Sequence, residues 1–169
     1  MALAVVVAVL QSSVAAGVLR GLMVLALIPC AVIDIERRII PNRTTGPGSA
    51  VALVAGTALD PSGELTRVLW ALGAGGFLLI ASLIRPAGMG MGDVKLTAMM
   101  GLFLGRPVVV ALFAALIASV LTGVALATRR GVYAARKTAL PFGPYLAFGG
   151  VLAALVGDSI IHWYLHLHG

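Results

Sequence analysis

Long apolar runs separated by short polar breaks extend along almost the whole chain. A helix that crosses a membrane needs about 20 predominantly apolar residues, within a range of about 17–25, and three of the runs are shorter than this. We therefore expect an all-α, polytopic integral membrane protein with six or seven transmembrane helices. We favour seven, with the short elements partly sheltered by protein. The runs are Ala2–Leu19, Gly21–Ile35, Gly46–Leu59, Leu65–Ile84, Val94–Leu104, Pro107–Thr128 and Ala139–Val156.

The composition supports a membrane protein and excludes other classes. Of the 169 residues, 60% are hydrophobic and 11% are charged, whereas a soluble domain is about 45–50% apolar and about 25% charged. A soluble globule and a disordered chain are thus excluded, and a single cysteine, Cys30, excludes a disulfide scaffold. We expect residues 1–169 to form one transmembrane domain, whose first segment is a retained helix rather than a removed signal peptide.

The positions of the charges predict an orientation. The net charge is +6, but the 12 basic residues lie in the breaks between apolar runs, without the basic face of a nucleic-acid-binding surface. Nine of the 12 lie in the breaks that contain Arg37, Arg85 and Arg129, and the positive-inside rule places these breaks in the cytoplasm. With seven spans, the N-terminus is then inside and the C-terminus outside.

Asp34 is one of two acidic residues that call for a functional explanation. It ends an apolar run at or just within the predicted cytoplasmic boundary, and Pro41 and Asn42 follow it. Pro41 disfavours helix at the residue before it and should stop the helix there. Taken alone, Asp34 is equally well interpreted as an interfacial side chain that reaches water.

Asp93 is the second such residue. It follows the glycines Gly88, Gly90 and Gly92, which leave an irregular backbone open to close approach by another chain. Asp93 then opens an apolar helix, and aspartate is a preferred N-cap. Capping alone would explain Asp93 if this motif stood by itself.

Together, the two carboxylates predict catalysis. The topology places both at one membrane face, and ionisable groups inside a bilayer cost about 2.5–3.5 kcal/mol and are often functional. Two carboxylates that share a proton can activate water and protonate a leaving group, as in aspartic peptidases. Because a helix N-terminus favours an anion and a C-terminus disfavours one, we predict that Asp93 holds the charge, with help from Lys95, and Asp34 the proton.

Three motifs, in order along the chain, resemble those of the type IV prepilin peptidase family. Gly90–Asp93, followed by Val94–Leu96, is similar to its GxGD signature. Asp34 with Ile40–Asn42 is similar to its first catalytic aspartate and the downstream proline motif, and Pro141–Ala147 to a late segment of the family. The resemblance covers about residues 30–150, most of the chain.

The resemblance implies a fold and a reaction. Family members are multi-spanning aspartic endopeptidases that remove the basic leader from pilin, pseudopilin or archaellin-like precursors at the cytoplasmic face of the cell membrane, for type IV pili or protein secretion. The matching positions make Asp34 and Asp93 the catalytic pair, with no cofactor or metal. Longer members also bind zinc through paired CxxC motifs and N-methylate the product; this chain resembles the short form, so the resemblance extends to the peptidase and not to methyl transfer. Supporting or substrate-binding positions are Pro41, Asn42, Gly90, Gly92 and Lys95.

Two functions from other classes stay open. Paired membrane carboxylates also relay ions in transporters, although the sequence lacks the related halves of a carrier. A noncatalytic assembly scaffold would keep its function without either aspartate. His162 and His166 have i, i+4 spacing, but they fall on the predicted outer side, so we predict no metal site. The expected partners are the precursor proteins and the lipid bilayer, and not nucleic acid.

Overall fold

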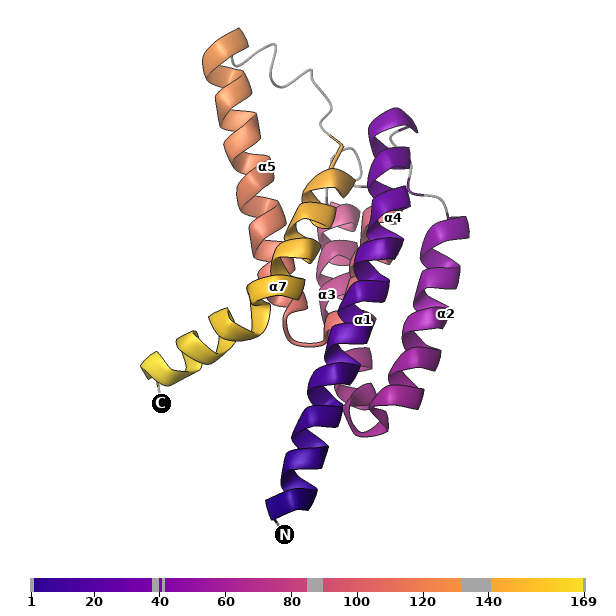
Figure 1. Cartoon of the computed structure of the whole chain (residues 1–169). Coiled ribbons are helices and arrows are strands. Elements are labelled where there is room, and N and C mark those ends of the chain that lie inside the picture. Colours follow the sequence, from indigo (N-terminus) through magenta and orange to yellow (C-terminus); the bar gives the residue numbers. More distant parts are fainter. Residues whose placement is uncertain (1, 38–39, 41, 85–89, 132–140, 169) are drawn as a thin grey trace.

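The computed structural model describes residues 2–37, 40, 42–84, 90–131 and 141–168, and this part of the chain is a bundle of helices without a strand (Figure 1). Successive helices run in opposite directions along the bundle (Figure 1). In order, the elements are α1 (Ala2–Arg37), α2 (Asn42–Leu59), the short 3₁₀ helix η1 (Pro61–Gly63), α3 (Glu64–Ile84), α4 (Met91–Leu104), α5 (Val108–Arg130) and α7 (Gly143–His168).

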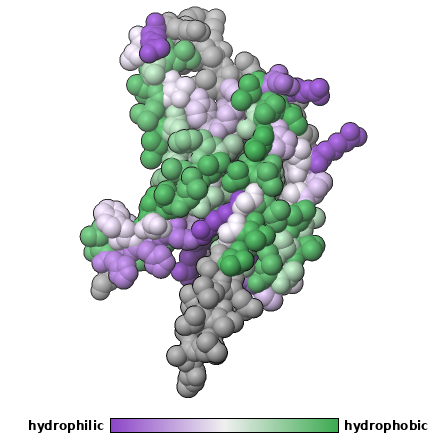
Figure 2. Space-filling model, viewed as in Figure 1, coloured by the Kyte–Doolittle hydropathy of each residue, from purple (hydrophilic) through white to green (hydrophobic). Residues whose placement is uncertain are grey.

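Within the described residues, four helices have the length and apolar character to cross a membrane, which confirms the expected all-α membrane class. The qualifying segments are Val14–Arg37, Pro61–Ile84, Val108–Arg129 and Gly143–Leu167. Hydrophobic side chains cover much of the visible surface between the two ends of the bundle (Figure 2). By contrast, α4 has only 14 residues, about 21 Å of helix, and is too short to cross alone.

The two spans predicted at the start of the chain were wrong, because α1 is one helix of 36 residues. The prediction broke the helix at Arg20, whose charge interrupts the apolar pattern. In the structure the Arg20 guanidinium forms an ion pair with Asp158 of α7, so the helix continues past it. The start of α1 and the end of α7 both lie towards the lower end of the bundle in Figure 1, whereas seven spans would put them on opposite sides of the membrane.

The short helix α4 lies at the centre of the bundle and contacts α1, α2, α3, α5 and α7. Small residues bring α3 and α4 close together. A Cβ on Gly101 would lie 2.5 Å from the Cα of Ala71, and a Cβ on Gly75 would lie 3.0 Å from the Cβ of Ala98. Close approach through small residues is the usual way in which helices pack in membranes, and here it holds α4 in a fixed place from which its first turn can present Asp93.

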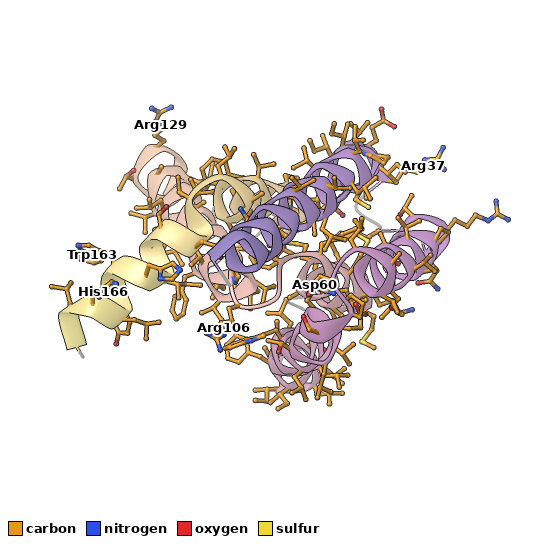
Figure 3. All side chains as sticks on the ribbon, turned by 60° about the horizontal axis from the view of Figure 1, so that its bottom comes forward. Arg37, Asp60, Arg106, Arg129, Trp163 and His166 are labelled. Carbon is orange, nitrogen blue, oxygen red and sulfur yellow. The ribbon has the colours of Figure 1, made fainter. Side chains whose placement is uncertain are left out.

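The two ends of the bundle are named here by one residue of each, the Asp34 end and the Arg106 end. The Asp34 end holds the last turn of α1 and the first turns of α4 and α7, and the Arg106 end holds the turns from α2 to α3 and from α4 to α5. Asp60 and Arg106 both lie at the second end, which comes forward in Figure 3.

Candidate active site

Asp34 lies in the last turn of α1 and is only 5% exposed. The backbone N–H of Gly143, the first residue of α7, donates a hydrogen bond of 3.0 Å to Asp34 Oδ2. The first N–H groups of a helix have no partner within the helix and are suited to bind an anion. A Cβ at position 143 would lie 2.5 Å from the same oxygen, so the contact depends on glycine.

Asp93 lies in the first turn of α4 and is 7% exposed. The N-cap of this helix is Gly90, in an extended conformation, and Asp93 occupies the third helical position. The prediction that Asp93 opens the helix as its N-cap was therefore wrong by three residues. Its carboxylate still satisfies the helix start, because the N–H of Gly90 donates to Asp93 Oδ2 at 3.1 Å.

The two carboxylates lie within electrostatic range of each other. The pKa of Asp93 is raised to about 6, chiefly by burial and in smaller part by the negative charge of Asp34, while the hydrogen bond from Gly90 acts in the opposite direction. Two carboxylates that are both withdrawn from water and near each other cannot ionise independently. The helices that carry them, α1 and α4, contact each other and α7, so both carboxylates lie at the same end of the bundle.

The remaining predicted site residues gather beside this pair where they are described. A Cβ on Gly92 would lie 2.8 Å from the Cβ of buried Ile40, so glycine lets the segment before α2 approach the start of α4. Lys95 was predicted to support Asp93, but its ammonium donates to the side-chain oxygen of Asn42 at 2.8 Å. It therefore links α4 to the start of α2. Pro41 and Gly88 lie outside the described residues.

Sequence reasoning gave too little weight to Gly143. The sequence analysis used the motif around it only for its resemblance to the family, whereas in the structure Gly143 both begins α7 and donates its N–H to Asp34. Pro144, which follows Gly143 at the start of α7, is the local signal, because proline is favoured in the first turn of a helix. Nothing in the sequence around position 143 shows that its N–H meets a carboxylate 109 residues away. Over the described ranges, His, Cys, Asp and Glu form no group of three that could hold a metal ion.

Fold and site together define an integral membrane protein with a pair of buried carboxylates at one end of a helix bundle. The sequence model of the type IV leader peptidase family matches residues 21–127, a range that includes Asp34 and Asp93. The chain belongs to this family, as its motifs predicted.

Named relatives agree with this family. The chain is 36% identical over 144 residues to the prepilin leader peptidase/N-methyltransferase of Bacillus subtilis, covering 83% of this chain and 56% of the relative. It is 32% identical over 163 residues to the protein of that name from Aeromonas salmonicida, covering 88% of this chain and 53% of the relative. It is 31% identical over 161 residues to that of Pseudomonas aeruginosa, covering 88% of this chain and 52% of the relative. The chain thus spans about half the length of these relatives. No solved structure matches it.

Proposed function

We propose that this chain is a membrane-embedded aspartic endopeptidase that removes the basic leader from type IV pilin-like precursors, and that Asp34 and Asp93 are its catalytic pair. One observation carries the proposal. Two buried carboxylates, from helices far apart in sequence, lie within electrostatic range, and each accepts a backbone N–H. The names of the relatives, prepilin leader peptidase/N-methyltransferase, supply the substrate class.

The proposed mechanism gives the two acids different roles. Asp93 lies at the N-terminus of α4, whose dipole favours an anion, and a pKa of about 6 leaves it mostly ionised at neutral pH. At Asp34 the C-terminus of α1 and the N-terminus of α7 oppose each other, so Asp34 is the better place for the shared proton.

In the reaction, a water between the two acids attacks the scissile carbonyl carbon. The Asp93 carboxylate takes a proton from this water, while the Asp34 carboxyl donates a hydrogen bond to the carbonyl oxygen. The C–N bond of the tetrahedral intermediate then breaks, the proton on Asp93 passes to the leaving amine, and the other product is a free carboxyl group. Burial matters here because a proton held by two carboxylates in water would be lost at neutral pH.

The orientation of the site is part of the proposal. Exposed Arg37, Arg43, Lys95 and Arg129 lie towards the Asp34 end, and the positive-inside rule then puts this end in the cytoplasm of a cell membrane. A precursor would keep its basic leader in the cytosol and its apolar helix in the lipid. Its cleavage site would thereby be brought to the depth of Asp34.

Leader removal in membranes tests the proposal. Wild-type protein and the variants Asp34→Asn, Asp93→Asn and Glu36→Gln would be incubated with a candidate precursor, and the new N-terminus identified by mass spectrometry. We expect each aspartate variant to lose cleavage and Glu36→Gln, an exposed carboxylate two residues from Asp34, to retain it. Normal cleavage by either aspartate variant would exclude the pair and would favour a scaffold.

A further inference from the structure

A second polar site lies at the Arg106 end of the bundle, far from the two catalytic candidates. It is a cavity of about 330 Å³ whose lining includes the charged residues Arg20, Asp60, Arg67, Arg106 and Asp158. These residues come from α1, α3, α7 and the turns between helices. Arg20 is 14 positions before Asp34 in the same helix, about 21 Å along its axis, so the cavity is not part of the carboxylate site.

One arginine of the cavity lining has no ion-pair partner among the described residues. Arg20 is paired with Asp158, and Arg67 is paired with Asp60 and with Glu64, which lies outside the lining. The guanidinium of Arg106 is exposed and has no carboxylate partner in the part of the chain that the structure describes. With Glu64 counted, three arginines stand against three carboxylates, so the cluster is neutral as a whole. The feature that suits an anionic ligand is therefore the exposed guanidinium of Arg106, unpaired within the described ranges, and not a surplus of charge.

Apart from Thr66, the uncharged side chains of the lining are apolar. Leu19, Phe103, Leu104 and Pro107 form walls beside the charged groups, and of these Leu19, Phe103 and Leu104 are buried parts of the core. A small inorganic anion would gain nothing from such walls. A ligand with a charged group joined to an apolar or glycerol portion would contact both kinds of surface.

The cavity also lies where a membrane surface is expected. The end of α2, the start of α3, the end of α4 and the start of α5 meet at this end of the bundle, and polypeptide turns of this kind lie at the edge of the hydrocarbon. Beyond the cavity, the last part of α7 turns away from the bundle (Figure 1) and carries exposed Trp163 and Tyr164. Tryptophan and tyrosine are enriched at the level of lipid headgroups.

We propose that this cavity binds the headgroup of an anionic glycerophospholipid, with the phosphodiester beside the guanidinium of Arg106 and the glycerol against the apolar walls. Hydrophilic side chains fill the angle between the projecting end of α7 and the bundle (Figure 2), and Arg106 lies at this end in Figure 3. The lipid would join α1, α7 and the turn between α4 and α5 at the membrane face opposite the catalytic candidates.

Native mass spectrometry of the delipidated full chain tests the proposal with phosphatidylglycerol as the probe. The matched pair is Arg106→Gln and Arg129→Gln, since both arginines are exposed and Arg129 lies at the other end of α5 (Figure 3). We expect half-saturation of the first bound lipid at about fivefold more phosphatidylglycerol in Arg106→Gln, and no change in Arg129→Gln. In Asp158→Asn, which frees Arg20, we expect tighter binding, a gain that misfolding cannot produce.

Two results would overturn the proposal. Equal lipid binding by the two arginine variants would show that Arg106 does not hold the headgroup. Full competition by inorganic phosphate at concentrations similar to those of the lipid would show that the cavity takes a free anion instead. Phosphatidylcholine tests the net charge of the lipid, because it is a zwitterion. Its binding to the wild type should be as weak as, or weaker than, the binding of phosphatidylglycerol to Arg106→Gln.

Discussion

Replacement of Asp93 by asparagine should stabilise the protein, but only at pH values at which Asp93 of the wild type is charged. The pKa of Asp93 is raised to about 6, above the ordinary value of about 3.9. Between about pH 4 and pH 6 the folded chain keeps a proton that the unfolded chain releases, so stability falls as the pH rises through this window. A shift of about two pH units corresponds to about 3 kcal/mol.

Asparagine removes the free-energy cost of burying the charged Asp93 side chain, and it keeps the hydrogen bond with Gly90. It is neutral at every pH, has nearly the same shape, and its side-chain oxygen can accept the N–H of Gly90 as Asp93 does. We expect Asp93→Asn to raise the free energy of unfolding by up to about 3 kcal/mol at pH 8, which is about 6–12 °C in Tm. The gain should shrink at pH 5 and vanish near pH 4.

The assay would follow the fraction of protein that stays monodisperse in size-exclusion chromatography after heating at pH 4.5, 6 and 8. Asp60→Asn is the control, and its expected change in stability has the opposite sign. The Ser62 hydroxyl and then the Arg67 guanidinium lower the pKa of Asp60, so its charged form stabilises the fold. Loss of that carboxylate should lower Tm at all three pH values. A gain for Asp93→Asn that persists unchanged at pH 4.5, or its absence at pH 8, would refute the reasoning.

Three glycine substitutions test the packing that positions the site. Gly143→Ala would place a Cβ 2.5 Å from Asp34 Oδ2, so we expect a near-normal Tm and a kcat at least about tenfold lower. Gly101→Ala would place a Cβ 2.5 Å from the Cα of Ala71 and should cost about 1–3 kcal/mol, seen as a lower Tm. Gly123→Ala, with nothing within 4 Å, is the control and should cleave normally. Normal cleavage by the first variant, or normal stability of the second, would contradict these contacts.

The general class and the carboxylate pair were predictable because they depend on local signals. Apolar runs near the length of a membrane crossing identify helices whatever their partners are. The charge bias of the breaks placed Asp34 and Asp93 on one membrane face, and the structure puts both at one end of the bundle. Their catalytic role stays a prediction that the activity assay must test.

Contacts between distant segments account for most of what the sequence did not predict. Arg20 ends an apolar run by composition, but its ion pair with Asp158 joins residues 138 positions apart and keeps α1 continuous. A hydropathy pattern depends on neighbouring residues along the chain, so it cannot identify a partner as distant as Asp158. The same holds for Gly143, whose N–H meets Asp34 across 109 positions. In a membrane helix a charge marks a boundary only if no other helix neutralises it.

The carboxylates at the two ends of the bundle have different partners, and this difference supports the proposed location of the active site. Asp60 and Asp158 form ion pairs with arginines, and the pKa of Asp60 is lowered by the Ser62 hydroxyl and then by the Arg67 guanidinium. In the described part of the chain, Asp34 and Asp93 accept hydrogen bonds from backbone N–H groups, which orient a carboxylate without adding a full positive charge. The pKa of Asp93 is raised to about 6, so this carboxylate can exchange a proton near neutral pH. An arginine introduced next to Asp93 should therefore fix its charge and stop catalysis, even if it strengthened the fold.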